Sequence, residues 1–170
     1  TAQMDSVPMV VLTGQTITPN LGKDAFQEAD VFGVTMPVVK HSYLVRNVND
    51  LPRVMNEAFH LATSGRPGPV LVDLPKDVVS AECEADFTDE FHLPGYAPPA
   101  RGLTEDLEKA AELISFSKKP LLYVGAGAVI AQASKQVIGL AEKLQAPVTT
   151  TLLGKGCLLY TSDAADEVLG

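Results

Sequence analysis

Four short segments of the sequence carry residue types that could take part in chemistry, and the first is a pair of glycines. Gly125 and Gly127 follow one apolar run and precede another. A strand, a glycine turn and a helix start can hold a phosphate, because free backbone N–H groups and the helix dipole point there. The dinucleotide fingerprint needs a third glycine where this chain has Ile130. A tight connection is therefore the simpler interpretation, and a nucleotide-type cofactor lying across it is the alternative.

Two cationic side chains flank another apolar run. Arg66 lies between turn-forming glycine and proline residues, and a guanidinium held there suits a phosphate or a planar polar ring. Lys76 directly follows the run, at the strand end where ligands bind in doubly wound sheets. A solvated turn arginine and an ordinary surface lysine are the alternatives.

The fourth segment, Asp-Ala-Phe-Gln-Glu, places Phe26 and Gln27 next to carboxylates. These residues could line a polar pocket with one apolar wall. Taken alone, the segment is better explained as the first turn of an amphipathic helix. The histidines and cysteines have no metal-ligand spacing, so no metal site is predicted.

The elements that must position these residues alternate between strands and helices. Asp24, Asn49 and Thr104 are the predicted N-caps, and Gly65 is the predicted end of the second helix. Strand–helix–strand order predicts an α/β fold with parallel sheets in three-layer domains. The predicted strands are 8–13, 38–45, 69–75, 119–124 and 147–152, and the predicted helices are 25–31, 50–64, 104–116 and 130–144.

Composition narrows the class of protein. The chain has 170 residues, 46% of them hydrophobic, and a formal net charge of −8 from 13 basic and 21 acidic residues. This acidity, without a Lys/Arg cluster, argues against binding nucleic acid. No apolar run approaches the roughly 20 residues needed to span a bilayer, so no membrane partner is expected. Two cysteines suit a reducing compartment, and we expect a cytoplasmic protein.

The periodic pattern of apolar residues that marks the strands and helices is interrupted at residues 79–102. Acidic residues are followed there by prolines and glycines, which predicts a linker between domains. The chain starts at Thr1 without a methionine and stops at Gly170 after a helix-like acidic stretch. We therefore expect a fragment that holds parts of two domains, with any targeting segment unobservable.

These segments, taken in order, resemble a known family. With this spacing, residues 1–156 resemble the large catalytic subunits of acetolactate synthase (acetohydroxyacid synthase), a thiamine diphosphate enzyme. The resemblance implies that 1–78 form the C-terminal half of the pyrimidine-binding domain, 79–102 the linker and 103–156 the N-terminal part of the FAD-binding middle domain. The matching segments are Met-Asp-Ser-Val-Pro, Leu-Thr-Gly-Gln, Asp-Ala-Phe-Gln-Glu-Ala-Asp, Pro-Val-Val-Lys-His-Ser-Tyr-Leu-Val, Ala-Thr-Ser-Gly-Arg-Pro-Gly-Pro-Val-Leu-Val-Asp-Leu-Pro-Lys-Asp-Val and Tyr-Val-Gly-Ala-Gly.

The resemblance also implies roles for single residues. Phe26 and Gln27 match a pair beside the thiazolium and substrate pocket, and Lys76 matches a lysine at the pocket entrance. Gln15 matches the start of a loop that borders the active-site channel, where Ile17 replaces a proline common in the family. The implied FAD contacts are Arg66, Gly125, Ala126, Gly127, Thr151 and Leu152.

Members of this family decarboxylate pyruvate and condense the hydroxyethyl unit with a second 2-keto acid, pyruvate or 2-ketobutyrate. The products, 2-acetolactate and 2-aceto-2-hydroxybutyrate, lead to branched-chain amino acids. The resemblance implies thiamine diphosphate, Mg2+ and FAD as cofactors, a homodimer or tetramer, and a small regulatory subunit as an optional partner. Glyoxylate carboligase, a related enzyme, and a stand-alone nucleotide-binding module are the alternatives.

Two further expectations concern the ends of the chain. The activating glutamate and the ligands of Mg2+ and diphosphate would lie outside this sequence, so the 170-residue polypeptide is expected to be inactive. Residues 157–170 depart from the family, and they look like the in-frame translation of a transposase-type sequencing adapter. A divergent strand–turn–helix is the alternative.

Overall fold

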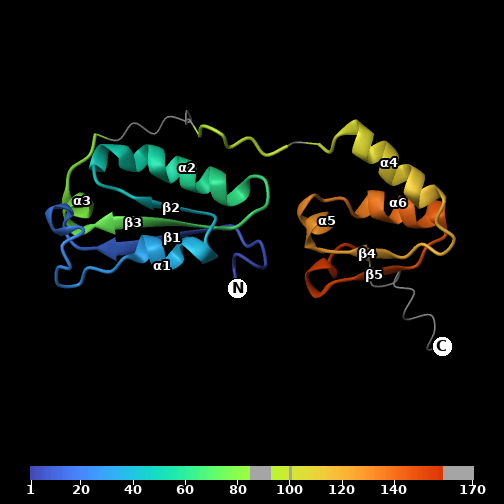
Figure 1. Cartoon of the computed structure of the whole chain (residues 1–170), viewed down its shortest axis with the longest axis horizontal. Helices are drawn as coiled ribbons and strands as arrows, with labels where there is room; N and C mark the ends of the chain where they lie inside the picture. The colour runs from blue at the N-terminus through green and yellow to red at the C-terminus, as the bar shows by residue number, and fades with distance from the viewer. Residues whose placement is uncertain (85–92, 100, 159–170) are drawn as a thin grey trace. The chain divides into compact units, whose positions relative to one another are not determined.

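The chain folds into two compact units, which are described separately. The computed structural model describes residues 1–84, 93–99 and 101–158. Unit 1 is Thr1–Ala100 and unit 2 is Arg101–Gly170. The division between the units falls inside the segment for which a linker is predicted. Figure 1 shows the elements of both units.

Unit 1 contains a parallel sheet with strand order β1-β3-β2. Both strand pairs are parallel, which confirms the predicted α/β fold with parallel strands. The elements in chain order are β1 Met9–Gln15, η1 Thr18–Asn20, α1 Val31–Thr35, η2 Met36–Val38, β2 His41–Leu44, η3 Val48–Asp50, α2 Leu51–Thr63, β3 Pro69–Pro75 and α3 Lys76–Ser80, where η marks a 3-10 helix.

Helix α2 packs on one face of this sheet and forms the core of unit 1. Apolar residues at three- and four-residue steps along α2, including Val54 and Leu61, are buried against Val70 and Val72 of β3. β3 is buried along almost its whole length, as expected for the central strand of a covered parallel sheet. Gly65 ends the helix region with a φ of +57°, which glycine adopts without a steric cost, so the predicted end is confirmed.

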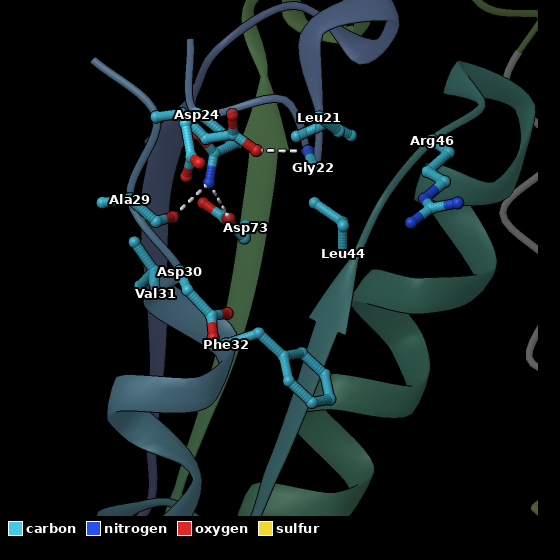
Figure 2. Close-up of a pocket in the computed structure, with 12 residues that line it drawn as sticks. Leu21, Gly22, Asp24, Ala29, Asp30, Val31, Phe32, Leu44, Arg46 and Asp73 are labelled. Carbon is cyan, nitrogen blue, oxygen red and sulfur yellow. Dashed lines mark hydrogen bonds between the residues drawn. The ribbon is translucent and has the colours of Figure 1, made fainter. Parts of the chain in front are cut away.

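The opposite face of the sheet carries α1 near the carboxyl ends of the strands. Val31 and Phe32 of α1 lie beside Leu44 of β2 and Asp73 of β3 (Figure 2). The register of the three parallel strands brings their carboxyl ends to one edge. Side chains that follow the strands are therefore collected at that edge.

The predicted helix over 25–31 is wrong. Residues 25–30 form turns and irregular chain, and α1 begins only at Val31. Its N-cap is Asp30, whose side chain accepts a hydrogen bond from the N–H of Gly33 at 2.9 Å. Acidic side chains in this segment bind nearby backbone N–H groups, and such bonds compete with a continuous helix.

Two other local predictions for unit 1 also need correction. A 3-10 turn precedes α2, so its N-cap is Asp50 and not Asn49, and neither side chain caps the helix. The predicted strand over 38–45 is shorter, because Pro37 lies in a 3-10 turn and β2 begins at His41. In both places the chain reverses locally before the regular element starts.

Part of the predicted linker packs on unit 1. The Tyr96 hydroxyl accepts a hydrogen bond from Lys40 Nζ at 2.9 Å and donates to the carbonyl oxygen of Ser64 at 3.0 Å. Lys40 Nζ also lies 5.2 Å from the centre of the Tyr96 ring, which adds a cation–π contact. Residues 85–92 and 100 of the linker lie outside the described residues.

Unit 2 contains a two-stranded parallel sheet with helices beside it. β4 pairs with β5, from Leu122 opposite Val148 to Val124 opposite Thr150. Its elements are α4 Thr104–Ser115, β4 Leu122–Val124, α5 Ala126–Ile130, α6 Ser134–Leu144, β5 Val148–Thr150 and η4 Leu152–Gly154. No residue of α4 or α6 is buried, so these amphipathic helices leave much of their apolar surface open.

The predicted helix over 130–144 begins later, as α6 at Ser134, and a separate short helix, α5, starts in the predicted glycine turn and ends at Ile130. Gln132, with a φ of +53°, separates α5 from α6. The N–H of Ala133 donates to the carbonyl oxygen of Ala128 at 2.9 Å, a hydrogen bond that closes a helix end around a left-handed residue. The predicted cap of α4 is also wrong, because Thr104 is its first residue and Leu103 is the N-cap.

Within the described residues, no helix is long and apolar enough to cross a membrane. Of the stretch 157–170, for which an adapter translation is predicted, residues 159–170 lie outside the described part of the chain. Cys157 is buried, and its sulfur accepts a hydrogen bond from the Ser134 hydroxyl at 3.5 Å.

Candidate functional site

A pocket of about 510 Å³ opens at the carboxyl edge of the unit 1 sheet. Phe26, Gln27 and Lys76 line it, although Lys76 lies far from the other two in the sequence. Gln15 and Ile17, at and after the end of β1, line the same pocket. The structure therefore brings together the three residues implied as catalytic and the channel residues beside them.

Phe26 and Gln27 are carried by a loop. The Phe26 side chain is 88% exposed, so packing does not hold it. The Glu28 carboxylate accepts hydrogen bonds from the backbone N–H groups of Ala25, at 2.9 Å, and of Gly22. These bonds, from Ala25 first and then Gly22, lower the pKa of Glu28 below its ordinary value. The charged carboxylate thus closes the loop that presents the two side chains.

Gln15 connects this loop to the sheet. Its Nε2 donates to the carbonyl oxygen of Ala29 at 2.7 Å and to Asp73 Oδ2 at 3.0 Å. Figure 2 shows both bonds in a second pocket of about 370 Å³, which Gln15 also lines. The amide of Gln15 therefore has a fixed orientation, because both of its donor bonds are used.

Asp73 is the buried anchor of this arrangement. It lies in the middle of the sheet with 1% of its surface exposed, and its Oδ1 accepts from the Thr13 hydroxyl at 2.7 Å. Buried carboxylates are stable when their oxygens are hydrogen-bonded. Sequence reasoning missed Asp73 and Glu28. An acidic residue inside an apolar strand pattern was the available signal for Asp73.

Lys76 is the first residue of α3, directly after β3. Its neighbour Asp77 accepts hydrogen bonds from the hydroxyl of Thr18 at 2.5 Å and from the Thr18 N–H at 3.0 Å. These bonds, led by the one from the Thr18 hydroxyl, lower the pKa of Asp77. The bonds hold the segment after Ile17 against α3, so one wall of the pocket is fixed next to Lys76.

Arg66 lies at the other end of β3. Its Nε donates to the Ser6 hydroxyl at 2.8 Å, and its Nη2 donates to the carbonyl oxygen of Met4 at 3.0 Å. β3 spans seven residues between Arg66 and Lys76, and a strand of that length extends about 20 Å. The structure therefore does not bring Arg66 to the pocket that Lys76 lines. Instead, the guanidinium stabilises the N-terminal turn by these hydrogen bonds.

The implied FAD segments of unit 2 meet at the carboxyl edge of its sheet. Gly125 follows β4 and is the N-cap of α5, whose first two residues are Ala126 and Gly127. Thr151 follows β5 and donates its N–H to the carbonyl oxygen of Val124 at 2.9 Å. Leu152, next to it, is 80% exposed.

The glycines at this edge differ in what surrounds them. A Cβ at Gly154 would overlap the carbonyl oxygen of Val124, so glycine is needed there for a close backbone approach. At Gly125 and Gly127, by contrast, a Cβ would meet no described heavy atom within 4 Å beyond the glycine itself, its chain neighbours and the backbone of its own helix. Neither has a positive φ. The fold of the described residues therefore gives no reason for glycine at these two positions.

The second part of the chain matches a described family of domains. Residues 107–170 match the family described as thiamine pyrophosphate enzyme, central domain. This match covers most of unit 2. This part of the chain is therefore similar to the central domain of thiamine pyrophosphate enzymes.

Most of the chain is also similar to part of several longer relatives. The chain is 52% identical to "Acetolactate synthase" of Arthrospira platensis over 158 residues, which cover 92% of this chain and 27% of the relative. It is 51% identical to the acetolactate synthase large subunit of Corynebacterium glutamicum over 155 residues, 91% of this chain and 25% of the relative. For the large subunit of Haemophilus influenzae, the identity is 43% over 172 aligned residues, with 100% of this chain and 30% of the relative covered. The predicted resemblance is confirmed.

The chain spans between a quarter and a third of the length of these relatives. The central-domain match and the Haemophilus influenzae alignment extend to the end of the sequence, whereas the other two cover about nine tenths of it. Among the described residues, no group of three His, Cys, Asp or Glu side chains could hold a metal ion.

Proposed function

We propose that the chain is a segment of an acetolactate synthase large subunit. The proposed reaction removes CO2 from one pyruvate and joins the remaining two-carbon unit to the carbonyl carbon of a second 2-keto acid. Pyruvate as the acceptor gives 2-acetolactate, and 2-ketobutyrate gives 2-aceto-2-hydroxybutyrate. The observation that carries the proposal is the identity of about half of the residues with acetolactate synthases over nine tenths of the chain.

The proposal assigns the two units to different tasks. Residues 1–78 would be part of the pyrimidine-binding domain, 79–102 the linker, and 103–156 part of an FAD-binding middle domain. When bound, thiamine diphosphate supplies the nucleophilic carbon at which pyruvate loses CO2. The pocket at the carboxyl edge of the unit 1 sheet supports this assignment, because α/β sheets bind ligands beyond their carboxyl strand ends.

The pocket residues suit a 2-keto acid. The Lys76 ammonium would attract the substrate carboxylate, and a hydrogen bond between charged groups contributes about 1.5–3 kcal/mol. The exposed Phe26 ring would form an apolar wall against the methyl group and exclude water from it. The Gln27 amide can donate and accept at once, so it would fix the orientation of a polar group on the cofactor or substrate.

The glycine positions of unit 2 support an FAD site. Gly125 and Gly127 face open space, and their lack of side chains would let a flat or phosphorylated ligand approach the backbone. Ala126, Thr151 and Leu152 would contact the same ligand, and Arg66 is a proposed FAD contact from unit 1. Ligands for Mg2+ and diphosphate would be supplied by other parts of the longer protein.

The proposal extends to assembly and location. The longer protein would act as a homodimer or tetramer in the cytoplasm, with a small regulatory subunit as an optional partner. The 170-residue chain alone is expected to form no acetolactate from pyruvate. Acetolactate formation by the purified chain would contradict this expectation.

A chimeric enzyme tests the function. Residues 1–156 replace the matching segment of the Corynebacterium glutamicum large subunit, and acetolactate formation from pyruvate is measured. We expect activity within about tenfold of the parent, because the two segments share half of their residues. Lys76→Gln in the chimera is expected to raise the KM for pyruvate about tenfold, the equivalent of one lost charged hydrogen bond. A chimera that folds and retains FAD but forms no acetolactate would refute the proposal.

A further inference from the structure

The loop that carries Phe26 and Gln27 is closed by one side chain. The Glu28 carboxylate accepts hydrogen bonds from the N–H groups of Ala25 at 2.9 Å, of Lys23 at 3.2 Å and of Gly22. A charged acceptor makes stronger hydrogen bonds with backbone N–H groups than a neutral one does. Glu28 therefore holds the conformation of the segment that precedes it, which a surface glutamate without such hydrogen bonds would not do.

A second tie holds the other end of the same loop. Gln15 Nε2 joins the carbonyl oxygen of Ala29, at 2.7 Å, to the carboxylate of Asp73, at 3.0 Å. Asp73 is buried in the central strand and is also bound by Thr13. The position after Glu28 is thus fixed to the buried central strand of unit 1.

Between the two ties the backbone adopts an unfavourable conformation. Gln27 has a φ of +61° and Asp24 a φ of +52°, both in the left-handed region that residues with a Cβ rarely adopt. Such conformations persist only where the surrounding structure imposes them. The Phe26 side chain is 88% exposed, so side-chain packing does not impose the conformation here.

We propose that Glu28 is a positioning residue, which together with the Gln15–Asp73 tie imposes the left-handed backbone at Gln27 and so presents Phe26 and Gln27 to the pocket. The benefit for catalysis rests on the proposed function, because it assumes that this pair contacts cofactor or substrate. The effect on the loop itself does not rest on that function. The two parts can therefore be tested separately.

The loop is tested by backbone amide relaxation in the 170-residue chain. The order parameter of the Gln27 N–H is measured in the wild type and in Glu28→Gln, which removes the charge and keeps the size. We expect a value near that of a rigid backbone, about 0.85, in the wild type, and below about 0.6 in the variant. Glu82→Gln removes the same charge from an exposed residue and serves as the control that leaves the value unchanged.

The second variant keeps the test valid if Glu28→Gln retains a neutral bond. Glu28→Ala removes the acceptor altogether and is expected to lower the order parameters of Phe26 and Gln27 at least as far. Amide signals of Val70 and Val72, which are buried in the core of unit 1, report whether the sheet is still folded. An unchanged Gln27 order parameter in Glu28→Ala, with the sheet folded, would overturn the proposal.

The catalytic part is tested in the chimera described above. If the loop only has to be correctly placed, Glu28→Gln should lower kcat/KM about tenfold, mainly through KM, while the midpoint of thermal unfolding stays constant. An inactive parent chimera would refute the proposed function and leave the relaxation result standing. A loosened loop with unchanged kcat and KM would overturn the positioning role in catalysis.

Discussion

Alanine at Gly125 and at Gly154 should have opposite effects, although both glycines lie at the same edge of the unit 2 sheet. A Cβ at Gly154 would overlap the carbonyl oxygen of Val124 and lie 3.1 Å from the Val124 carbonyl carbon. Both neighbours are backbone atoms, so no side chain can turn away to relieve the contact. We expect Gly154→Ala to lower the free energy of unfolding of unit 2 by about 1–3 kcal/mol, the usual cost of overpacking.

Gly125→Ala should be harmless to the fold. Its φ is −102°, which any residue adopts, and a Cβ there would meet no described atom within 4 Å beyond the glycine itself and its chain neighbours. Replacing glycine at such a position stabilises proteins by about 0.4–1 kcal/mol, because the unfolded chain loses freedom. If FAD lies against this glycine, the same methyl group should reduce FAD binding by the chimera about tenfold or more.

Two measurements test these expectations, one of local stability and one of FAD binding. Amide hydrogen exchange of Val124 in the 170-residue chain reports the local stability of β4 for both variants. FAD content of the purified chimera, read from its absorbance, reports the ligand site for Gly125→Ala. Equal destabilisation by the two substitutions would refute the packing argument. Full FAD retention by Gly125→Ala would refute the argument that the open space at Gly125 belongs to the flavin.

Three further predictions test the packing and the hydrogen bonds of unit 1. Leu61→Ala should lower the free energy of unfolding by about 2–5 kcal/mol in urea titrations, because Leu61 is 6% exposed, while Leu113→Ala, at a site of unit 2 that is 75% exposed, should change the stability of its own unit by less than about 0.5 kcal/mol. Thr18 lowers the pKa of Asp77. The hydrogen bonds between these two residues should therefore be complete above the ordinary aspartate pKa and be lost as the pH falls through the lowered pKa. Thr18→Val should raise the pKa of Asp77 in a carboxyl NMR titration, and an unchanged titration would contradict this. Asp77→Asn should make the backbone signals of residues 16–20 independent of pH over the same range.

Much of the fold follows from the sequence because its signals are strong. The apolar run of β3 and the periodic face of α2 each point to a single arrangement of the chain, and both are found almost at the predicted bounds. Gly65 likewise marks a left-handed helix end, where glycine is the common choice. The burial of apolar side chains determines these elements, and local polar interactions are too weak to change them.

The errors arise where polar side chains bind the backbone. The pattern around Phe26 resembles a helix turn. In the structure, however, the side chains of Glu28 and Asp30 accept hydrogen bonds from nearby backbone N–H groups, and such bonds compete with a continuous helix. The break at Gln132 has no glycine or proline to announce it. Such choices depend on single hydrogen bonds, which contribute about 0.5–1.5 kcal/mol each and are hard to rank from sequence alone.

The candidate site was predictable only in part. Phe26, Gln27 and Lys76 are implied by resemblance, and the parallel sheet explains why Lys76 lies at a ligand-binding edge. Asp73 and Glu28 could not be assigned to roles, since nothing in the sequence tells which buried or looped carboxylate faces which donor. The partners of Asp73 depend on the register of β1 and β3, which are far apart in the chain. Those of Glu28 depend on the conformation of an irregular loop.

The strand order of unit 1 has a consequence for handling the chain. In the described part of the molecule β1 pairs with β3 alone, and Met9 and Leu12 on it are 42% and 55% exposed. An open seven-residue edge strand without lysine or proline can pair with the same strand of a second molecule. The net charge of −8 opposes such contact, but salt at 0.15 M limits this repulsion to about 8 Å. Colloidal stability of the preparation should therefore fall as salt is added, and dilute, low-salt buffer should keep the molecules apart.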